Sequence, residues 1–302
     1  MASSHNEQSR YEQLELFSDA APQMVRPSDI IALSDPDASS SPLAQATSIL
    51  NLGALPHREH DALDECLRRP DPNNASMISE AEHAVYRECD TAPLLLGIDE
   101  AGRGPWAGPV VAAAVVLPVG FGVSSPLPQE LARLNDSKRL TERQRLQLIE
   151  PICRIALGVG IGISDASLID KTSITQANYM AMYFAVVRAL KVVQKSAQST
   201  QITDAHLPIL ALVDGKYQVP PLTLNQIPMI KGDQRSYHIA AASVIAKVTR
   251  DKMMVAAHRS YPHYGFSRHK GYGTPEHQKA LREHGPCPLH RYSFRPIKEL
   301  LS

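Results

Sequence analysis

The sequence contains few of the residues that build covalent or metal-bound frameworks, and it lacks a membrane-length apolar run. Its four cysteines lie far apart without a CxxC pair, which argues against a zinc site or a disulfide framework. Aromatic residues make up 5% of the chain, so the core must be mainly aliphatic. The longest apolar run, residues 110–117, is far shorter than the roughly 20 residues that cross a bilayer. Because the first residues also lack the pattern of a secretory signal, we expect a cytoplasmic protein with reduced thiols.

The net charge of the chain is also zero, but only because the charges of an acidic segment and a basic segment cancel. The chain has 31 Lys+Arg and 31 Asp+Glu. Residues 1–90 hold 6 basic and 16 acidic side chains and no lysine, whereas residues 91–302 hold 25 basic and 15 acidic ones. The total of zero therefore excludes nothing about nucleic acid, and the positive surplus of the second segment favours a polyanionic partner.

The same two segments differ in composition. Residues 1–60 are rich in Ser, Pro, Asp, Ala and Gln, and such a stretch buries too little apolar surface to offset the entropy of ordering. Short helices are predicted near residues 58–69 and 79–89, and the second opens with the capping-box pattern Ser79-x-x-Glu82. We predict an acidic, mostly disordered extension over residues 1–90 and one folded domain over residues 91–302.

Five apolar stretches in the second segment predict strands, and four longer stretches predict helices. The strands are expected at residues 94–98, 110–117, 159–163, 209–213 and 227–230. The helices are expected near residues 142–156, 174–195, 237–257 and 275–284. Thr141, Ser173 and Thr274 have the character of N-cap residues for three of these helices. Because strands come first and helices follow, we predict a mixed α/β sandwich.

Acidic residues stand at or just after the ends of three predicted strands. Asp99 and Glu100 follow the first strand, Asp214 follows the fourth, and Asp233 lies just beyond the fifth. Carboxylates at apolar strand ends are costly unless they are paired, hydrogen-bonded or metal-bound. If the strands are neighbours, Mg²⁺ or Mn²⁺ would relieve the repulsion between the converging acids, and two such ions roughly 3.5–4 Å apart can drive phosphodiester hydrolysis. The alternative is that these acids only cap turns or pair with nearby basic side chains.

Six motifs of the second segment resemble the signature of bacterial ribonuclease HII, and they occur in that family's order. They are GIDEAGRGPWAGP at 97–109, NDSKRL at 135–140, VDG at 213–215, KGD at 231–233, AAASVIAKVTRD at 240–251 and HKGYGT at 269–274. The related ribonuclease HIII fits less well, because its signature lacks the GRG found here at 102–104. The resemblance spans about residues 92–295, which is nearly all of the basic segment.

The resemblance implies a ribonuclease H-like fold, in which a mixed five-stranded sheet is flanked by helices and followed by a C-terminal helical segment. It also implies an endoribonuclease that cuts RNA in RNA–DNA hybrids and cuts 5′ of single ribonucleotides embedded in duplex DNA, leaving 5′-phosphate and 3′-hydroxyl ends. Matched by motif, the metal-binding and catalytic acids would be Asp99, Glu100, Asp214 and Asp233, with Mg²⁺ or Mn²⁺ as the cofactor. Asp251 is interpreted instead as a structural partner for a nearby base.

Recognition of a single ribonucleotide requires a sensor for its 2′-hydroxyl, which both donates and accepts hydrogen bonds. Gly102-Arg103-Gly104 suits this task, because glycines let the backbone approach the sugar closely. In the family this segment contacts the 2′-hydroxyl and phosphates, and the tyrosine that matches Tyr272 packs against the ribose. The alternatives are a tight turn for the glycines and ordinary packing for Tyr272.

Basic side chains are expected to hold the phosphates of the duplex. Lys138, in the NDSKRL motif, is the one we assign to substrate binding. Other basic residues are as readily explained by a solvated surface. His284, His290 and Arg291 have no evident mechanistic role from sequence.

A short pattern near the N-terminus resembles the peptide by which many bacterial replication and repair proteins bind the β sliding clamp. It is QLELF at residues 13–17. Leu14, Leu16 and Phe17 supply its apolar character, and Gln13 would anchor one end by hydrogen bonds. The alternative is an incidental amphipathic stretch, because patterns of this length arise by chance.

Two other functions remain open at this point. The chain could be a different ribonuclease H-like enzyme, such as a structure-selective DNA nuclease, or a catalytically inactive hybrid-binding protein. The full set of acids argues against the inactive protein, because a surface that only binds phosphates has no use for converging carboxylates. We expect a monomer with no membrane association.

Overall fold

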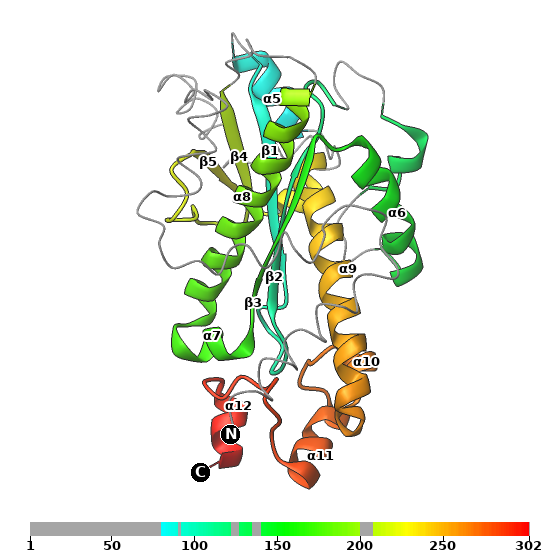
Figure 1. The fold of residues 1–302 in the computed structure, drawn as a ribbon, viewed down its shortest axis with the longest axis vertical. Helices are drawn as coiled ribbons and strands as arrows, with labels where there is room; N and C mark the ends of the chain where they lie inside the picture. The colour runs from blue at the N-terminus through cyan, green and yellow to red at the C-terminus, as the bar shows by residue number, and fades with distance from the viewer. Residues whose placement is uncertain (1–79, 90–91, 122–126, 135–139, 200–207, 302) are drawn as a thin grey trace.

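The computed structural model describes residues 80–89, 92–121, 127–134, 140–199 and 208–301 (Figure 1). The clamp-like residues Gln13, Leu14, Leu16 and Phe17 lie outside these ranges, as do Lys138 and the helix expected near residues 58–69. The predictions made for them, including disorder of the extension, stay predictions.

A mixed sheet of five strands, in the order β3-β2-β1-β4-β5, forms the centre of the molecule. The strands are β1 (Leu94–Ala101), β2 (Val110–Val116), β3 (Gly158–Ser164), β4 (Ile209–Asp214) and β5 (Asn225–Met229). β1 pairs antiparallel with β2 and parallel with β4, and β4 pairs parallel with β5. The predicted mixed α/β fold and its five strands are thus confirmed. Pro228 lies within β5, which tolerates it because β5 is an edge strand.

Helices cover both faces of this sheet (Figure 1). The long helices are α6 (Glu142–Ile155), α8 (Ile174–Ser199) and α9 (Tyr237–Ser260). The shorter ones are α5 (Glu80–Glu88), α7 (Ala166–Lys171), α10 (Phe266–His269), α11 (Pro275–His284) and α12 (Arg295–Leu301). Single 3₁₀ turns are η1 (Gln129–Leu131), η2 (Gly232–Gln234) and η3 (Pro262–Tyr264). Helices α10 to α12 form the expected C-terminal helical segment, at the end of the molecule beyond α7.

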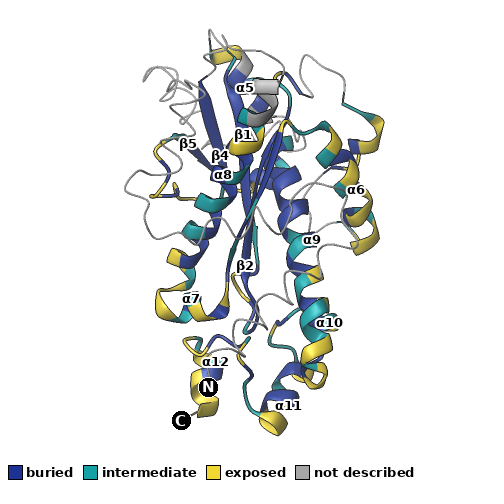
Figure 2. Ribbon diagram, viewed as in Figure 1, coloured by how far each residue is buried: buried dark blue, intermediate teal, exposed yellow. Residues whose placement is uncertain are grey.

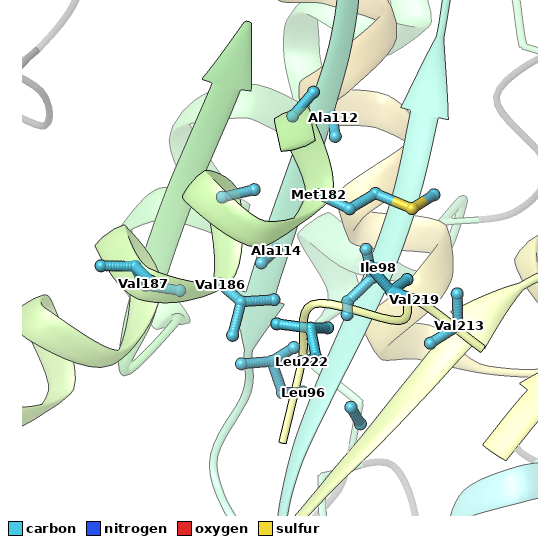
Figure 3. Close-up of a cluster of buried hydrophobic side chains, with 14 of the residues drawn as sticks. Leu96, Ile98, Ala112, Ala114, Met182, Val186, Val187, Val213, Val219 and Leu222 are labelled. Atoms are coloured by element: carbon cyan, nitrogen blue, oxygen red, sulfur yellow. The ribbon is translucent and has the colours of Figure 1, made fainter. Parts of the chain in front are cut away.

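The alternation of side chains along β1 assigns one set of residues to each face. Leu96 and Ile98 point toward α8 and pack with Met182 and Val186 in one aliphatic core (Figure 3). Residues of β2 on the opposite face, such as Val115, pack instead against the alanine-rich part of α9 and against α6. The strands and the inner sides of α8 and α9 are accordingly buried (Figure 2). This division of faces decides where Asp99 and Glu100 point.

Helix α5 belongs to the folded unit, although it precedes the boundary expected at residue 91. Ala84 and Val85 are fully buried against Leu95, Leu212 and their neighbours on the face of the sheet that carries α9. The packed unit therefore includes α5. Composition could not reveal this, because the helix is acidic on average while Ala84 and Val85 carry the contact.

The N-caps predicted for three helices are present. Thr141 forms a complete capping box with Gln144, Ser173 accepts from the main-chain N of Gln176 at 3.2 Å, and Thr274 caps α11. Ser79, the N-cap expected for α5, lies outside the described residues, so its capping box with Glu82 stays a prediction. The Glu82 carboxylate accepts from the Ser236 hydroxyl at 2.9 Å, at the start of α9.

Candidate active site at the ends of three strands

Parallel pairing brings the first two acidic strand ends side by side. In the register of β1 and β4, Ile98 lies opposite Val213, so the next residues, Asp99 and Asp214, are neighbours. The main-chain N of Glu100 donates to Asp99 Oδ1 at 2.7 Å. The convergence that the sequence suggested for these acids is therefore real.

The third strand end reaches the same place through a tight turn. Lys231 has a φ of 55°, in the left-handed region, and this turns the chain so that the N–H of Gly232 donates to Asp214 Oδ1 at 2.8 Å. Asp233 follows in η2 and is 3% exposed. A sparsely populated backbone conformation next to a buried acid is typical of a position that holds a functional side chain.

Asp99 and Glu100 point to opposite faces of β1 and have different surroundings. Asp99 faces α9 and accepts a hydrogen bond from the Ser243 hydroxyl. Glu100 faces α8, where the Asn178 amide donates to it, and its carboxylate lies 3.5 Å from the Arg103 guanidinium. The alternative interpretation, in which the acids pair with nearby bases, therefore holds for Glu100, which pairs with Arg103.

Burial and mutual repulsion make this cluster unfavourable for negative charge. The pKa of Asp99 is raised well above its usual range, first by burial, then by the charges of Asp214 and Glu100. The pKa of Glu100 is also raised by burial, which outweighs the opposing effect of Arg103. Such a set of oxygen donors is stabilised by a hard cation, which cancels the repulsion and replaces the missing solvation.

The carboxylates fit a divalent cation, but they do not enclose one. Among the described residues, no group of three or more His, Cys, Asp or Glu side chains is arranged so that it could hold a metal ion by itself. Mg²⁺ is commonly bound by only one or two carboxylates, with waters and substrate phosphates completing its shell. The carboxylates at the strand ends agree with an open metal site of this kind, in which the substrate supplies some of the ligands.

The second predicted element, the glycine turn after β1, lies against the predicted tyrosine. Gly102 has a φ of +99°, and any Cβ there would overlap the Arg250 side chain and approach the Pro109 carbonyl. A Cβ built on Gly104 would lie 3.9 Å from the Tyr272 ring, so the turn and the tyrosine are in contact range. The glycines therefore form a tight turn, as the alternative interpretation has it, and this turn also lies next to the Tyr272 ring.

Tyr272 is exposed, yet its main chain is held firmly. The residue is 46% exposed, and the Arg250 guanidinium lies 6.0 Å from the centroid of its ring. On its N-terminal side, Gly271 accepts a hydrogen bond from the main-chain N of Trp106 at 2.9 Å. Ordinary core packing does not describe such a residue, because nearly half of its surface faces solvent.

Asp251 has the structural role expected of it. Its carboxylate lies 2.6 Å from Lys247 Nζ and 3.8 Å from the Arg145 guanidinium.

Several residues near the site have no signal in the sequence. Asn178, one turn into α8, contacts Glu100, and Tyr217, 72% exposed, lines the same pocket as Glu100 and Asp214. Arg250 and Arg291 are buried and donate to main-chain carbonyls around the glycine turn. A buried arginine cannot be told from a surface one by local pattern, since both occur in polar stretches.

The chain is similar in sequence to proteins of a known family. The family profile of Ribonuclease HII matches residues 96–297. The chain belongs to the ribonuclease HII family. It is 46% identical over 211 residues to a ribonuclease HII of Geotalea daltonii, covering 70% of this chain and 87% of that protein. It is 47% identical over 211 residues to one of Chloroflexus aurantiacus, covering 68% of this chain and 89% of that protein.

The fold of the chain is similar to that of a solved ribonuclease HIII structure. A crystal structure of Bst-RNase HIII in complex with Mn²⁺ superposes with a TM-score of 0.51 at 17% identity, covering 73% of this chain and 71% of that one. Membership of the ribonuclease HII family makes the protein a metal-dependent endoribonuclease of the ribonuclease H type 2 class, which acts on RNA–DNA hybrids. No helix in the described part of the chain is long and apolar enough to span a membrane.

Proposed function

We propose that the protein hydrolyses RNA within RNA–DNA hybrids and also cuts duplex DNA on the 5′ side of a single embedded ribonucleotide, leaving 5′-phosphate and 3′-hydroxyl ends. The observation that carries this proposal is the position of the glycine turn. Gly102 follows directly after the acidic end of β1, and Gly104 lies against the exposed ring of Tyr272. A ribose that packs on the exposed side of Tyr272, beside Gly104, would place its phosphate near the carboxylates.

In this proposal Asp99, Glu100, Asp214 and Asp233 hold Mg²⁺ or Mn²⁺. Bound ions of this class activate a water and neutralise charge on the leaving oxygen. The protein's own contribution is positional: Ser243 and the Glu100 main-chain N orient Asp99, and the Gly232 N–H orients Asp214. The Mn²⁺ bound by Bst-RNase HIII supports the choice of cation class, and both ions remain candidates.

Substrate selection is assigned to the other predicted residues. Gly102, Arg103 and Gly104 would contact the 2′-hydroxyl and the adjacent phosphates, and Tyr272 would pack on the ribose. Arg103 is half exposed and can turn from Glu100 toward a phosphate. Lys138, from the segment outside the described residues, would hold the backbone further along the duplex.

One cleavage assay tests the function. The substrates are duplex DNA with one ribonucleotide, the same duplex without it, and a continuous RNA–DNA hybrid, each with Mg²⁺, with Mn²⁺ and with chelator. Cutting of the first and third substrates only, abolished by chelator, is expected. Cutting of all-DNA duplex would instead support a structure-selective DNA nuclease, and binding without cutting would support an inactive hybrid-binding protein.

A matched pair of substitutions tests the acids. Asp214→Asn should abolish cleavage while leaving hybrid binding nearly intact, because it removes charge but little volume. Asp165→Asn is the control: Asp165 follows β3, which β2 separates from β1, it caps α7, and asparagine is an equally good N-cap. An Asp214→Asn protein that cuts at nearly the wild-type rate would contradict the assignment.

The extension N-terminal to α5 is proposed to carry a docking peptide. Residues Gln13, Leu14, Leu16 and Phe17 would occupy an apolar groove of the β sliding clamp, as separate binding motifs on extended chains do. A peptide of residues 8–20 should bind the clamp at micromolar concentration, and a Leu16→Ala, Phe17→Ala peptide should not. Absence of binding at high micromolar concentration would dispose of this part of the proposal.

A further inference from the structure

The C-terminal segment 287–293 lies against the glycine turn, which in turn lies against the Tyr272 loop. The main-chain N of Gly108 donates to the Leu289 carbonyl and that of Arg291 to the Trp106 carbonyl, both at 2.8 Å. On its other side, Trp106 donates to the Gly271 carbonyl at 2.9 Å. Three chain segments that are distant in sequence thus form one hydrogen-bonded strip, with residues 106–108 in the middle.

Arg291 holds the glycine turn through hydrogen bonds from all three nitrogens of its guanidinium. This side chain is fully buried and donates to the carbonyls of Gly108 at 3.0 Å, Arg103 at 2.9 Å and Gly102 at 2.5 Å. Burial lowers the pKa of Arg291 to about 9. A buried cation is costly, and a planar fork with three directed bonds fixes the carbonyls as a lysine could not. The arrangement therefore sets the orientation of the peptide groups in the turn.

His290, the preceding residue, holds the Tyr272 main chain through a second histidine. The Tyr272 carbonyl can only accept, so His277 Nδ1, 2.9 Å away, must donate to it. In a neutral ring His277 Nε2 then accepts from His290 Nε2, also at 2.9 Å, and His290 Nδ1 accepts from the Cys287 N–H at 2.9 Å. Each ring nitrogen in this series is then either a donor or an acceptor. The hydrogen bonds therefore run in one direction, from the Cys287 N–H to the Tyr272 carbonyl.

A surface carboxylate fastens the segment to the body of the molecule. Asp170 in α7 accepts from the main-chain N of Tyr292 at 2.9 Å and of Ser293 at 2.8 Å, and from the Ser293 hydroxyl at 2.6 Å. These bonds follow directly after Arg291. They limit how far the guanidinium can move relative to α7 and to the sheet.

We propose that residues 287–293 act as a brace that sets the geometry of ribose recognition, with Arg291 and His290 as its two positioning residues. Arg291 fixes the peptide groups of the glycine turn, and His290 acts through His277 on the main chain of Tyr272. This inference rests on the proposed function, because it assumes that the turn and Tyr272 contact the ribose. In the described part of the chain, neither positioning residue hydrogen-bonds to the carboxylates at the strand ends.

The brace predicts selective loss of activity on one substrate. Arg291→Lys keeps the charge but loses the fork, and it should lower kcat/KM on duplex DNA with one ribonucleotide by roughly 10- to 100-fold, the usual cost of a small misplacement of a contact. The loss on continuous hybrid should be several-fold smaller, because many riboses there offer alternative registers. Arg188→Lys is the matched control, since Arg188 also donates to a main-chain carbonyl, that of Ile161 in the edge strand β3. It should leave the ratio of the two activities unchanged.

A second variant and a second measurement keep the test decisive if Arg291→Lys does not fold. Asp170→Asn loosens the same segment from the exposed surface, and it should shift the substrate ratio in the same direction by a smaller factor. In chelator, fluorescence anisotropy should show that wild type binds the single-ribonucleotide duplex more tightly than the all-DNA duplex. Both variants should reduce that difference.

The possible outcomes separate the brace from the function on which it rests. Equal losses on both substrates, or an unchanged binding difference, would overturn the brace while leaving the proposed function standing. A wild-type protein that cuts hybrid but never the single-ribonucleotide duplex would overturn the proposed selectivity, and the brace with it.

Discussion

Glu82 offers a strong test of whether α5 is part of the folded unit. Its carboxylate is fully buried between α5 and the start of α9. One oxygen, Oε1, accepts from the Ser236 hydroxyl at 2.9 Å and the His238 main-chain N at 3.4 Å, and lies 2.9 Å from His238 Nδ1. Glu82→Ala would leave these groups buried without their acceptor. The first residues of α9 would then lose a cap supplied from outside the helix.

The size of the effect follows from these contacts. A buried donor left unpaired costs about 1–3 kcal/mol, and Glu82 contacts the Ser236 hydroxyl and two nitrogens of His238. Because the contacts to Glu82 share one oxygen, they do not add fully, and about 3–5 kcal/mol is expected in total. Glu82→Gln should cost much less. It keeps an acceptor at Oε1, and its amide nitrogen would occupy the place of Oε2, which has no partner among the described residues.

The assay is urea unfolding of the full chain, followed by circular dichroism, with Glu88→Ala as the control. Glu88 lies in the same helix but is exposed, so its loss should change the free energy of unfolding by less than about 0.5 kcal/mol. A value for Glu82→Ala within about 1 kcal/mol of the Glu88→Ala value would refute the reasoning. The helix would then be a dispensable attachment to the sheet.

Three further outcomes are expected. Gly97→Ala should destabilise the protein by roughly 1–3 kcal/mol or more in the same urea assay, because the added methyl would overlap the main chain of His238; a change below 0.5 kcal/mol would contradict that contact. Burial lowers the pKa of both His277 and His290 to about 4 from 6.5, so the unfolded chain binds more protons between these values. The free energy of unfolding should therefore fall as pH drops from 6.5 toward 4, by up to about 1.4 kcal/mol per pH unit for each histidine. Raised carboxyl pKa values at the strand ends act in the opposite sense, so the histidine contribution is read as the difference in slope between wild type and His290→Asn, and equal slopes would exclude it. Finally, hybrid binding should weaken steeply with salt because residues 91–302 carry 25 basic and 15 acidic side chains, and a flat salt dependence would count against phosphate contacts.

The sequence by itself determined the parts of this protein that depend on short-range pattern. Apolar runs located the strands, and Thr141, Ser173 and Thr274 marked helix starts, because an N-cap bonds to main chain only two or three residues away. The motif residues Asp99 and Tyr272 were identifiable for a similar reason. Their chemistry requires a given residue type within a short, ordered motif.

The tertiary structure alone decided which distant residues hold these parts in place. Glu82 contacts a helix that begins 155 residues later, and Arg291 reaches Gly102 across 189 positions. The sheet order and register, rather than the motifs, set Asp99 beside Asp214. Such partners leave no local signature, because a buried carboxylate or guanidinium is defined by what packs around it. The zero net charge is similar: the sequence showed two segments of opposite charge, but only packing showed that α5, in the acidic segment, is part of the folded unit.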